Sequence, residues 1–346
     1  MKIIKFGALG EPADVLKLFN EPSAPLRAGE ARVKVLATPI HPSNLLQIAG
    51  RYGTIPPLPS VPGSEGVGEV TEVAPDVTHL NVGQHVLLAG GSTWRDEIAG
   101  PAAGFIPLPA GGDVEQLSML TVNPLTAHLI LQNFVDLKPG DWIIQSAANS
   151  AVGEFIVQLA AQRGIRTVNV VRRESLAADL KALGANVVLV EGADLAARVS
   201  GATSGAPIVL AIDCVGGETF SHLLKTLAFG GTIVSYGALS MQSPALDQIA
   251  IIFNDVRVRG FWLSKWFETA SAQDKQASFG KTIQLVASGA LKAKVDSRFS
   301  LEDIKAAVTR AAQPGRNGKV LLMPQMAAEP VRKTSFLANL GFGKKD

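Results

Sequence analysis

The sequence predicts an α/β protein in which a β-barrel domain is followed by a doubly wound parallel sheet. Up to about residue 120 the chain reads as all-β, with alternating apolar residues and frequent Gly and Pro. From about Asn123 onward, short apolar strands alternate with helical runs, a pattern typical of a parallel sheet covered by helices. The strand, small-residue turn and helix of residues 141–160 are the most informative part of this second half.

In the first part, residues 31–37 alternate with period two, and residues 66–73 continue a twisted barrel strand in which glycines allow bending. In the second part we expect these strands and helices: a helix near 125–134, the unit at 141–160 with its second strand at 167–171, strands at 186–190, 208–214 and 232–236, and a helix near 219–228.

Residues 256–262 supply one more alternating strand, which could lie at a sheet edge and pair with another subunit in a homodimer. The return segment predicts a helix near 275–288, a strand at 294–299, a helix starting at the cap Ser300 with Asp303 three residues on, and a closing strand at 318–323. The tail from 324 to 346 has no clear partner in the pattern.

Composition excludes several classes of protein. The 346 residues suffice for two domains with full cores, and 47% hydrophobic against 18% charged residues argues against disorder. No apolar run is long enough to span a bilayer, and a net charge of +2 gives no basic field for nucleic acid. A strand pattern that begins at Met1 leaves no room for a signal or transit peptide, so we expect a cytoplasmic protein.

The turn after the strand at 142–145 is built to approach an anion. Ala148, Ser150 and Gly153 occupy the three glycine positions of G-x-G-x-x-G, and small residues let the backbone come close to a dinucleotide pyrophosphate at the helix N-terminus. The alternative is an ordinary strand–helix–strand crossover with tight packing.

The end of the following strand favours NADP(H) as the cofactor. An NAD site has Asp or Glu roughly 20 residues after the glycine turn, but Arg172 and Arg173 stand there, with Arg172 nineteen residues after Gly153. Guanidinium groups suit a 2′-phosphate, although the two arginines could also be solvated charges at a strand end.

Cysteine and histidine usage argues against a metal site or a disulfide. Cys214 is the only cysteine, and its place at the end of an apolar strand favours a buried inert thiol. Four of the five histidines lack partners at ligand or triad spacing and are interpreted as structural or surface residues: His79, His85, His128 and His222.

A glycine-rich barrel, a nucleotide fold and a short return segment together resemble the medium-chain dehydrogenase/reductase superfamily, whose domains are a GroES-like barrel and a Rossmann fold. Its zinc enzymes carry a catalytic Cys, a Gly-His-Glu histidine and a four-cysteine lobe. Here His41 stands in place of that Cys, Ser64 replaces the histidine, and the lobe is absent. Because a lone His cannot hold a catalytic zinc, the sequence resembles the zinc-free branch.

Within that branch, six segments resemble the 2-enoyl thioester reductases of fatty acid synthesis, of the mitochondrial trans-2-enoyl-CoA reductase type: residues 50–56, 91–97, 122–127, 149–153, 169–172 and 259–266. The resemblance implies a catalytic domain made of residues 1–122 and 267–346, with the tail 324–346 unassigned. It implies an NADP-binding domain of residues 123–266.

The resemblance also implies roles for individual residues. Tyr52 would donate a proton. Cofactor contacts would be Asn123, Asn149, Ser150, Ala151, Val152, Gly153, Arg172, Arg173, Tyr236, Gly237, Ala238, Leu239, Phe261, Trp262, Leu263, Ser264 and Lys319. Asn44, Trp94 and Trp266 would line the acyl pocket, although either tryptophan could equally be core filler.

Three positions depart from the family pattern. Ala151 stands where Gly is usual, Asn44 where Asp is usual, and Glu174 where a second arginine often stands. Arg173 could substitute for that arginine.

These features predict an NADPH-dependent reductase of trans-2-enoyl thioesters carried on CoA or acyl carrier protein. Reduction places charge on the thioester oxygen and then needs a proton at the α-carbon, which a fixed phenol can supply. Tyr52 could instead only pack against the prolines of residues 56–59. The alternatives are a zinc-free quinone oxidoreductase, which would also reduce small enones, and a non-catalytic NADPH-binding protein of the same fold.

Overall fold

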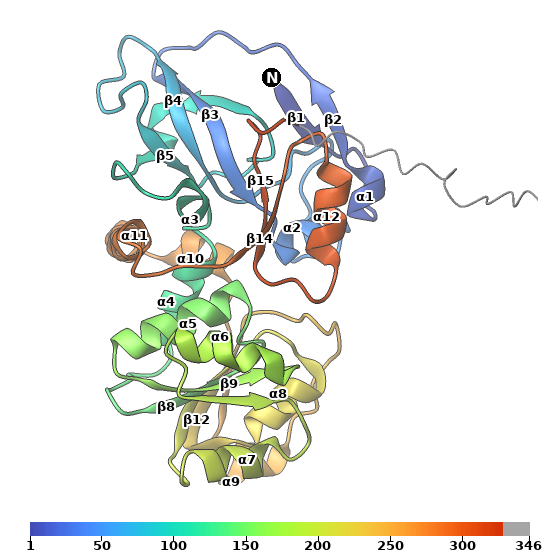
Figure 1. The fold of residues 1–346 in the computed structure, drawn as a ribbon, viewed down its shortest axis with the longest axis vertical. Helices are drawn as coiled ribbons and strands as arrows, with labels where there is room; N and C mark the ends of the chain where they lie inside the picture. Colours follow the sequence, from blue (N-terminus) through green and yellow to red (C-terminus); the bar gives the residue numbers. More distant parts are fainter. Residues whose placement is uncertain (328–346) are drawn as a thin grey trace, which may run out of the picture.

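The computed structural model describes residues 1–327 and has two lobes joined by helices (Figure 1). The upper lobe in Figure 1 is rich in antiparallel strands, and the lower lobe is a parallel sheet flanked by helices. This confirms the predicted fold class, a GroES-like barrel with a Rossmann domain.

The upper lobe is built on a seven-stranded sheet in the order β14-β15-β3-β4-β5-β7, with β6 paired to β3. Its strands are β3 (Glu30–Pro39), β4 (Gly66–Val73), β5 (His85–Leu88), β6 (Glu97–Pro101), β7 (Phe105–Pro107), β14 (Val295–Phe299) and β15 (Lys319–Leu322). A separate hairpin pairs β1 (Lys2–Lys5) with β2 (Lys17–Asn20). Because β15 pairs antiparallel to β3, strands near the C-terminal end of the described chain complete the sheet of the N-terminal lobe.

The expectation of an all-β first part is wrong, since helices α1 (Pro12–Val15), α2 (Pro42–Ile48) and α3 (Val114–Ser118) lie there, with the short turn η1 (Ala102–Gly104). The start of α2 has local causes. Pro42 occupies the first helical turn, and the side-chain oxygen of Asn44 accepts from the His41 backbone N–H at 2.9 Å. Such a cap begins a short helix even within a β-rich region.

The lower lobe is a six-stranded, wholly parallel sheet in the order β10-β9-β8-β11-β12-β13. Its strands are β8 (Trp142–Gln145), β9 (Arg166–Val171), β10 (Val187–Val190), β11 (Ile208–Asp213), β12 (Leu227–Ser235) and β13 (Arg257–Gly260). The strand order therefore reverses between β8 and β11, and doubly wound folds bind ligands at such a switch point.

The helices of the lower lobe and the return segment are α4 (Asn123–Asn133), α5 (Ala151–Gln162), η2 (Glu174–Leu176), α6 (Ala177–Ala182), α7 (Leu195–Ala202), α8 (Gly217–Leu224), α9 (Gln248–Phe253), α10 (Leu263–Thr269), α11 (Ala272–Ala287) and α12 (Ile304–Ala312). Two predicted boundaries are wrong. The helix expected near 219–228 ends at Leu224, and β12 already begins at Leu227. Helix α12 has Asp303, not Ser300, at its N-cap, and the Ser300 hydroxyl donates to the Asp303 carboxylate at 2.8 Å.

One hydrophobic core runs through both lobes. It includes Val67 and Leu87 of the barrel strands together with Ile143 and Phe155 of the parallel sheet and α5. Continuous packing of this kind fixes how the two lobes sit relative to each other, since close-packed side chains transmit displacements. No helix within residues 1–327 is both long and apolar enough to cross a bilayer.

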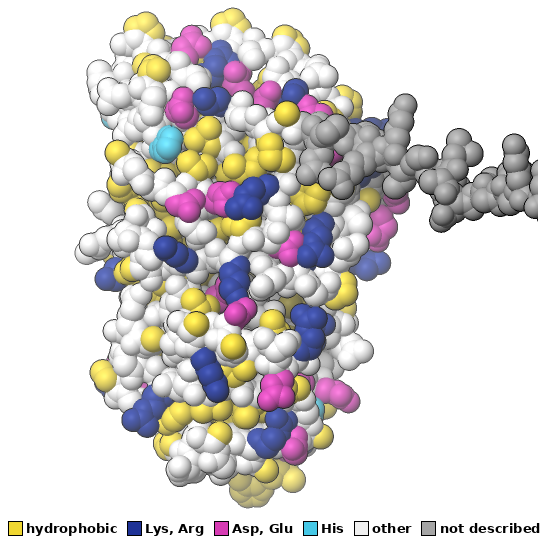
Figure 2. Space-filling view, viewed as in Figure 1, with side chains coloured by type: hydrophobic (Ala, Val, Ile, Leu, Met, Phe, Trp, Pro, Cys, Tyr) yellow, Lys and Arg dark blue, Asp and Glu magenta, His cyan; other side chains and the backbone are white. Residues whose placement is uncertain are grey.

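Charge is interspersed on the face shown in Figure 2, where Lys and Arg alternate with Asp and Glu over both lobes. Apolar exposure concentrates instead beside β13, the edge of the parallel sheet. Val258 on that strand is exposed, as are Ile249, Ile252 and Phe253 on α9. An exposed strand edge next to apolar side chains is suited to pairing with a second chain.

Candidate active site

The carboxyl ends of β8 and β11 are joined by a buried hydrogen bond. The Ser146 hydroxyl donates to Asp213 Oδ1 at 2.7 Å. The Asp213 carboxylate also accepts from the backbone N–H groups of Val215 and Gly216, at 3.1 and 2.9 Å. The fully buried Asp213 therefore holds the two loops that border the switch point, where a ligand is expected.

The turn from β8 to α5 has the geometry that the sequence predicts. Ser150 is the N-cap, and its hydroxyl accepts from the Gly153 N–H at 3.1 Å. A Cβ on Gly153 would lie 2.5 Å from the Ala148 carbonyl oxygen, so no larger residue fits there. Ala147 adopts a φ of 44°, which turns the chain sharply before the helix. The N-terminus of α5 thus presents free backbone N–H groups.

The predicted residues around that turn take different positions. Asn149, Ser150 and Ala151 are half-buried, whereas the Val152 side chain packs into the core and leaves only its backbone for a ligand. Tyr236 and Leu239 lie beside the β11–α8 turn, because their backbone N–H groups donate to the carbonyls of Asp213 and Cys214. Their neighbours Gly237 and Ala238 complete this segment.

Two side chains in this region are kept neutral by burial. Burial raises the pKa of the Cys214 thiol to about 11, which agrees with the predicted inert thiol. Burial also raises the pKa of Tyr236 well above its usual range, so its phenol stays protonated.

Arg172 and Arg173 follow β9 directly, and both are exposed. Neither forms a salt bridge with any residue of 1–327. Arg166, at the start of the strand, instead places its guanidinium over the Trp142 ring, 5.7 Å from the centroid. Two guanidinium groups without a carboxylate partner are suited to bind an anion such as a phosphate.

Tyr52 and Trp262 meet across the cleft. Tyr52 belongs to the loop after α2, and Trp262 is the N-cap of α10 after β13. The Trp262 indole Nε1 donates to the Tyr52 hydroxyl at 3.0 Å, and the rings pack edge to face with centroids 6.0 Å apart. Because the phenol oxygen accepts this bond, its own proton remains free to be donated. The other residues of the segment, Phe261, Leu263 and Ser264, flank Trp262.

A buried chain of polar groups runs through the barrel lobe to the start of α4. Lys319 Nζ donates to His41 Nδ1 at 2.9 Å, and His41 Nε2 lies 2.8 Å from Glu65 Oε1. Since Nδ1 accepts from Lys319, Nε2 carries the proton and donates to Glu65. Glu65 Oε2 accepts from the backbone N–H groups of Thr121 and Val122, which lead into α4. The network therefore ties the barrel to the start of α4, the first helix of the lower lobe.

Burial sets the protonation of this network. It lowers the pKa of His41, with the Lys319 charge acting in the same direction, so His41 is neutral as its hydrogen bonds require. Burial lowers the pKa of Lys319 to about 7 despite the attraction of Glu65. Glu65 was not predicted as a site residue from the sequence, although it directly follows Ser64, the position that holds the histidine in zinc members of the superfamily.

The three predicted substrate-pocket residues lie in different environments. Asn44 donates to the Ser64 hydroxyl at 2.7 Å and so belongs to the polar side of the cleft. Trp94 is fully buried in the core cluster with Ile4 and Phe6, a position that favours its alternative role as core filler. Trp266 is half-buried on α10 and packs edge to face on Phe267, with ring centroids 5.3 Å apart.

Two buried polar atoms at the cleft lack a partner among the described residues: Asn123 Nδ2 and Thr121 Oγ1. Buried donors are normally satisfied, so unpaired ones next to a cleft point to a ligand. Asn123 is also a predicted cofactor contact. These two atoms, the α5 N-terminus and the free arginines fit a dinucleotide phosphate bearing a polar head group.

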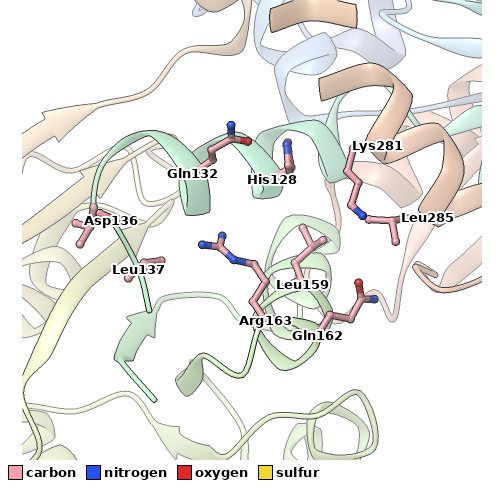
Figure 3. Close-up of a pocket in the computed structure, with 10 residues that line it drawn as sticks. His128, Gln132, Asp136, Leu137, Leu159, Gln162, Arg163, Lys281 and Leu285 are labelled. Carbon is pink, nitrogen blue, oxygen red and sulfur yellow. The ribbon is translucent and has the colours of Figure 1, made fainter. Parts of the chain in front are cut away.

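A cavity of about 430 Å³ lies away from these residues, between α4, α5 and α11 (Figure 3). Its lining includes His128, Arg163 and Lys281. Burial lowers the pKa of His128, and the charges of Arg163 and Lys281 lower it further. None of the predicted catalytic or cofactor residues lines it.

Comparison with known proteins identifies two domain families. Residues 27–109 match the family model described as alcohol dehydrogenase GroES-like domain, and residues 151–284 match the model described as zinc-binding dehydrogenase. Despite the second description, residues 1–327 contain no group of three or more His, Cys, Asp or Glu side chains placed to hold a metal ion.

Two curated relatives with high coverage are both described as mitochondrial enoyl-[acyl-carrier-protein] reductases. The chain is 37% identical over 329 residues to the mitochondrial enoyl-[acyl-carrier-protein] reductase of Homo sapiens, covering 93% of this chain and 88% of the relative. It is 35% identical to the protein of the same name from Arabidopsis thaliana, covering 84% and 80%. The expectation of a cytoplasmic protein is wrong on this comparison, because these relatives are named as mitochondrial.

Solved structures agree in fold. The mitochondrial 2-enoyl thioester reductase Etr1p/Etr2p heterodimer from Candida tropicalis superposes with a TM-score of 0.84 at 28% identity, covering 93% of this chain and 99% of that one. An Etr1p complex with NADP and crotonyl-CoA gives 0.85 at 28% identity. A protein described as an NADPH:quinone reductase from Bacillus thuringiensis gives 0.85 at 32% identity, covering 93% and 98%. The chain therefore belongs to the medium-chain dehydrogenase/reductase superfamily, in the family of 2-enoyl thioester reductases.

Proposed function

We propose that this protein reduces trans-2-enoyl thioesters, on CoA or acyl carrier protein, with hydride from NADPH and a proton from Tyr52. The observation that carries the proposal is the Tyr52 hydroxyl, which accepts from Trp262 and keeps its proton free at the cleft. The enoyl-[acyl-carrier-protein] reductase relatives and the Etr1p complex with NADP and crotonyl-CoA support the same chemistry.

NADPH, when bound, supplies the hydride. The chain's own residues bind and orient: the α5 N-terminus receives the pyrophosphate, Arg172 and Arg173 the 2′-phosphate, and Asn123 the polar end of the nicotinamide. Lys319 and the segments 236–239 and 261–264 complete the cofactor contacts. Lys319 already uses one N–H on His41, and its remaining donors are available to a ligand.

Tyr52 performs two tasks in this scheme. While charge develops on the thioester oxygen, the phenol donates a hydrogen bond to it, and afterwards it supplies the proton for the α-carbon. The Trp262 N–H fixes the position of the phenol oxygen by donating a hydrogen bond to it at 3.0 Å. Asn44 and Trp266 are proposed to border the acyl chain.

The test of function measures NADPH oxidation in parallel with crotonyl-CoA and with a quinone. The proposal expects crotonyl-CoA to be the better substrate by kcat/KM. A preference for the quinone would favour the runner-up, a zinc-free quinone oxidoreductase, which the Bacillus thuringiensis neighbour supports. Binding of NADPH without turnover of either substrate would identify a non-catalytic protein.

The reaction is proposed to be independent of zinc. Both ring nitrogens of His41 are engaged, Nδ1 by Lys319 and Nε2 by Glu65, so no lone pair remains for a metal. Crotonyl-CoA reduction is expected to be unchanged after dialysis against EDTA. Activity that falls with EDTA and returns with added zinc would contradict this.

A homodimer is proposed to form along β13. The strand is exposed along its whole length, and a two-fold axis would pair it with its copy while covering Ile252 and Phe253 of α9. Val258→Asp is expected to give monomers by light scattering at micromolar concentration, because charge at the strand edge blocks pairing. The control Val82→Asp changes a valine of the other lobe that is even more exposed, 63% against 43% for Val258. A monomeric wild-type protein would rule the dimer out.

We also propose the division of labour that the sequence indicates, with residues 1–122 and 267–346 as the catalytic domain and 123–266 as the NADP-binding domain. The mixed sheet and the parallel sheet support it, since β14 and β15 return to the barrel. Residues 328–346, most of the unassigned tail, lie outside the described part of the chain.

A further inference from the structure

A loop of the barrel lobe lies against the proposed 2′-phosphate site. It joins α12 to β15 and contains Gly315, where a Cβ would come within 3.8 Å of Arg173 Nη1. Arg173, which follows the end of β9 in one lobe, and this loop of the other lobe therefore lie next to each other.

The next residue of the loop, Arg316, is a cation without a carboxylate partner. Its Nε donates to the Gln313 carbonyl oxygen at 3.3 Å, and it forms no salt bridge within residues 1–327. The nearest acid, Asp296, is already bound by Arg310 through two bonds of 2.6 and 2.8 Å. Burial lowers the pKa of Arg316, and its charge in turn lowers the pKa of Lys319. The guanidinium is thus partly desolvated and lies on the Lys319 side of the loop.

Arg172, Arg173 and Arg316, none of which has a carboxylate partner among the described residues, therefore lie on the two segments that meet where Gly315 approaches Arg173. Guanidinium groups from both segments match the oxygens of a phosphate bound at this point. Glu174 makes the lower lobe less basic than it would be with the arginine often found at that position. A cation from the opposite lobe, such as Arg316, would replace the positive charge that Glu174 does not supply.

We propose that Arg316 binds the 2′-phosphate of NADPH together with Arg172 and Arg173, so that the barrel lobe contributes to cofactor selection. This inference rests on the proposed use of NADPH. A guanidinium fork matches the phosphate oxygens, and contacts from both lobes would hold the cleft closed on the cofactor. Arg316 is then a specificity-determining residue.

The test is the dissociation constant of NADPH and of NADH, measured by nicotinamide fluorescence without an enoyl substrate. Arg316→Gln is expected to weaken NADPH binding about tenfold and to leave NADH binding within about twofold, since only NADPH carries the 2′-phosphate. Arg27→Gln, which alters an exposed arginine far along the barrel lobe, serves as the control. Should Arg316→Gln fail to fold, Arg316→Lys keeps the charge but loses the fork, and is expected to weaken NADPH binding by a smaller factor.

The outcomes separate this inference from the proposed function. A wild-type preference for NADPH that Arg316→Gln leaves intact would overturn the role of Arg316 alone. Equal weakening of NADPH and NADH would assign Arg316 to a group common to both and would also overturn it. A wild-type protein without any preference would contradict the NADPH assignment itself, and inactivity with crotonyl-CoA would leave the binding test unaffected.

Discussion

Replacing Tyr52 with phenylalanine is expected to lower the turnover of crotonyl-CoA by roughly 10²–10⁴-fold, the usual contribution of a positioned acid. The substitution deletes one hydroxyl and leaves the ring, which packs edge to face on Trp262. NADPH binding should persist, because Tyr52 is placed toward the substrate and not among the phosphate contacts. Steady-state kinetics with crotonyl-CoA, combined with NADPH fluorescence titration, measures both quantities.

A structural tyrosine would behave differently. If the phenol only accepted the Trp262 hydrogen bond, its removal would cost about 1 kcal/mol of stability and little activity. Quinone reduction provides an internal control, since it needs no proton delivered to carbon and should fall much less. Near wild-type crotonyl-CoA reduction by Tyr52→Phe would refute the assigned role and weaken the case against quinone reduction.

Substituting both Arg172 and Arg173 with alanine is expected to remove most of the preference for NADPH over NADH. Each charge-assisted bond to the 2′-phosphate contributes about 1.5–3 kcal/mol, and exposure of both side chains reduces that through solvent screening. A fall in the preference of about 30- to 10³-fold follows, because about 1.4 kcal/mol corresponds to a factor of ten. The ratio of kcat/KM values for the two cofactors measures it.

Arg27→Ala is the matched control for the arginine pair, as it removes an exposed arginine far from β9. NADH kinetics of the double variant should stay close to wild type, because NADH lacks the phosphate. Wild-type protein that uses NADH as readily as NADPH would show that the two arginines are only solvated charges.

Local features of the site could be predicted because the residues that create them are neighbours in the chain. Ser150 caps α5 three residues before the Gly153 N–H that it accepts from, and Arg172 follows β9 by one residue. The predicted strands of the parallel sheet agree with the structure to within a few residues, except that β12 starts earlier, at Leu227. Their apolar runs reflect burial on both faces, which is a property of each segment taken alone.

Other predictions failed where a short element or a packing choice was decided by context. Helix α2 interrupts the β-rich region because of the cap formed by His41 and Asn44, a signal only a few residues long. Nothing in the residues around Trp94 distinguished pocket from core, and the structure places it fully inside. The expected cytoplasmic location was also wrong, and it was corrected by the mitochondrial names of the relatives and not by the structure.

By itself, the sequence determined the α/β fold class, the small-residue turn before α5 and the arginines after β9, since each depends on residues close together in the chain. Only the tertiary structure decided which distant residues meet. Trp262 reaches Tyr52 across 210 residues, Lys319 reaches His41 across 278, and Gly315 brings its loop to Arg173. These contacts exist because β15 returns to pair with β3 and because one core runs through both lobes, and no local pattern encodes such pairings.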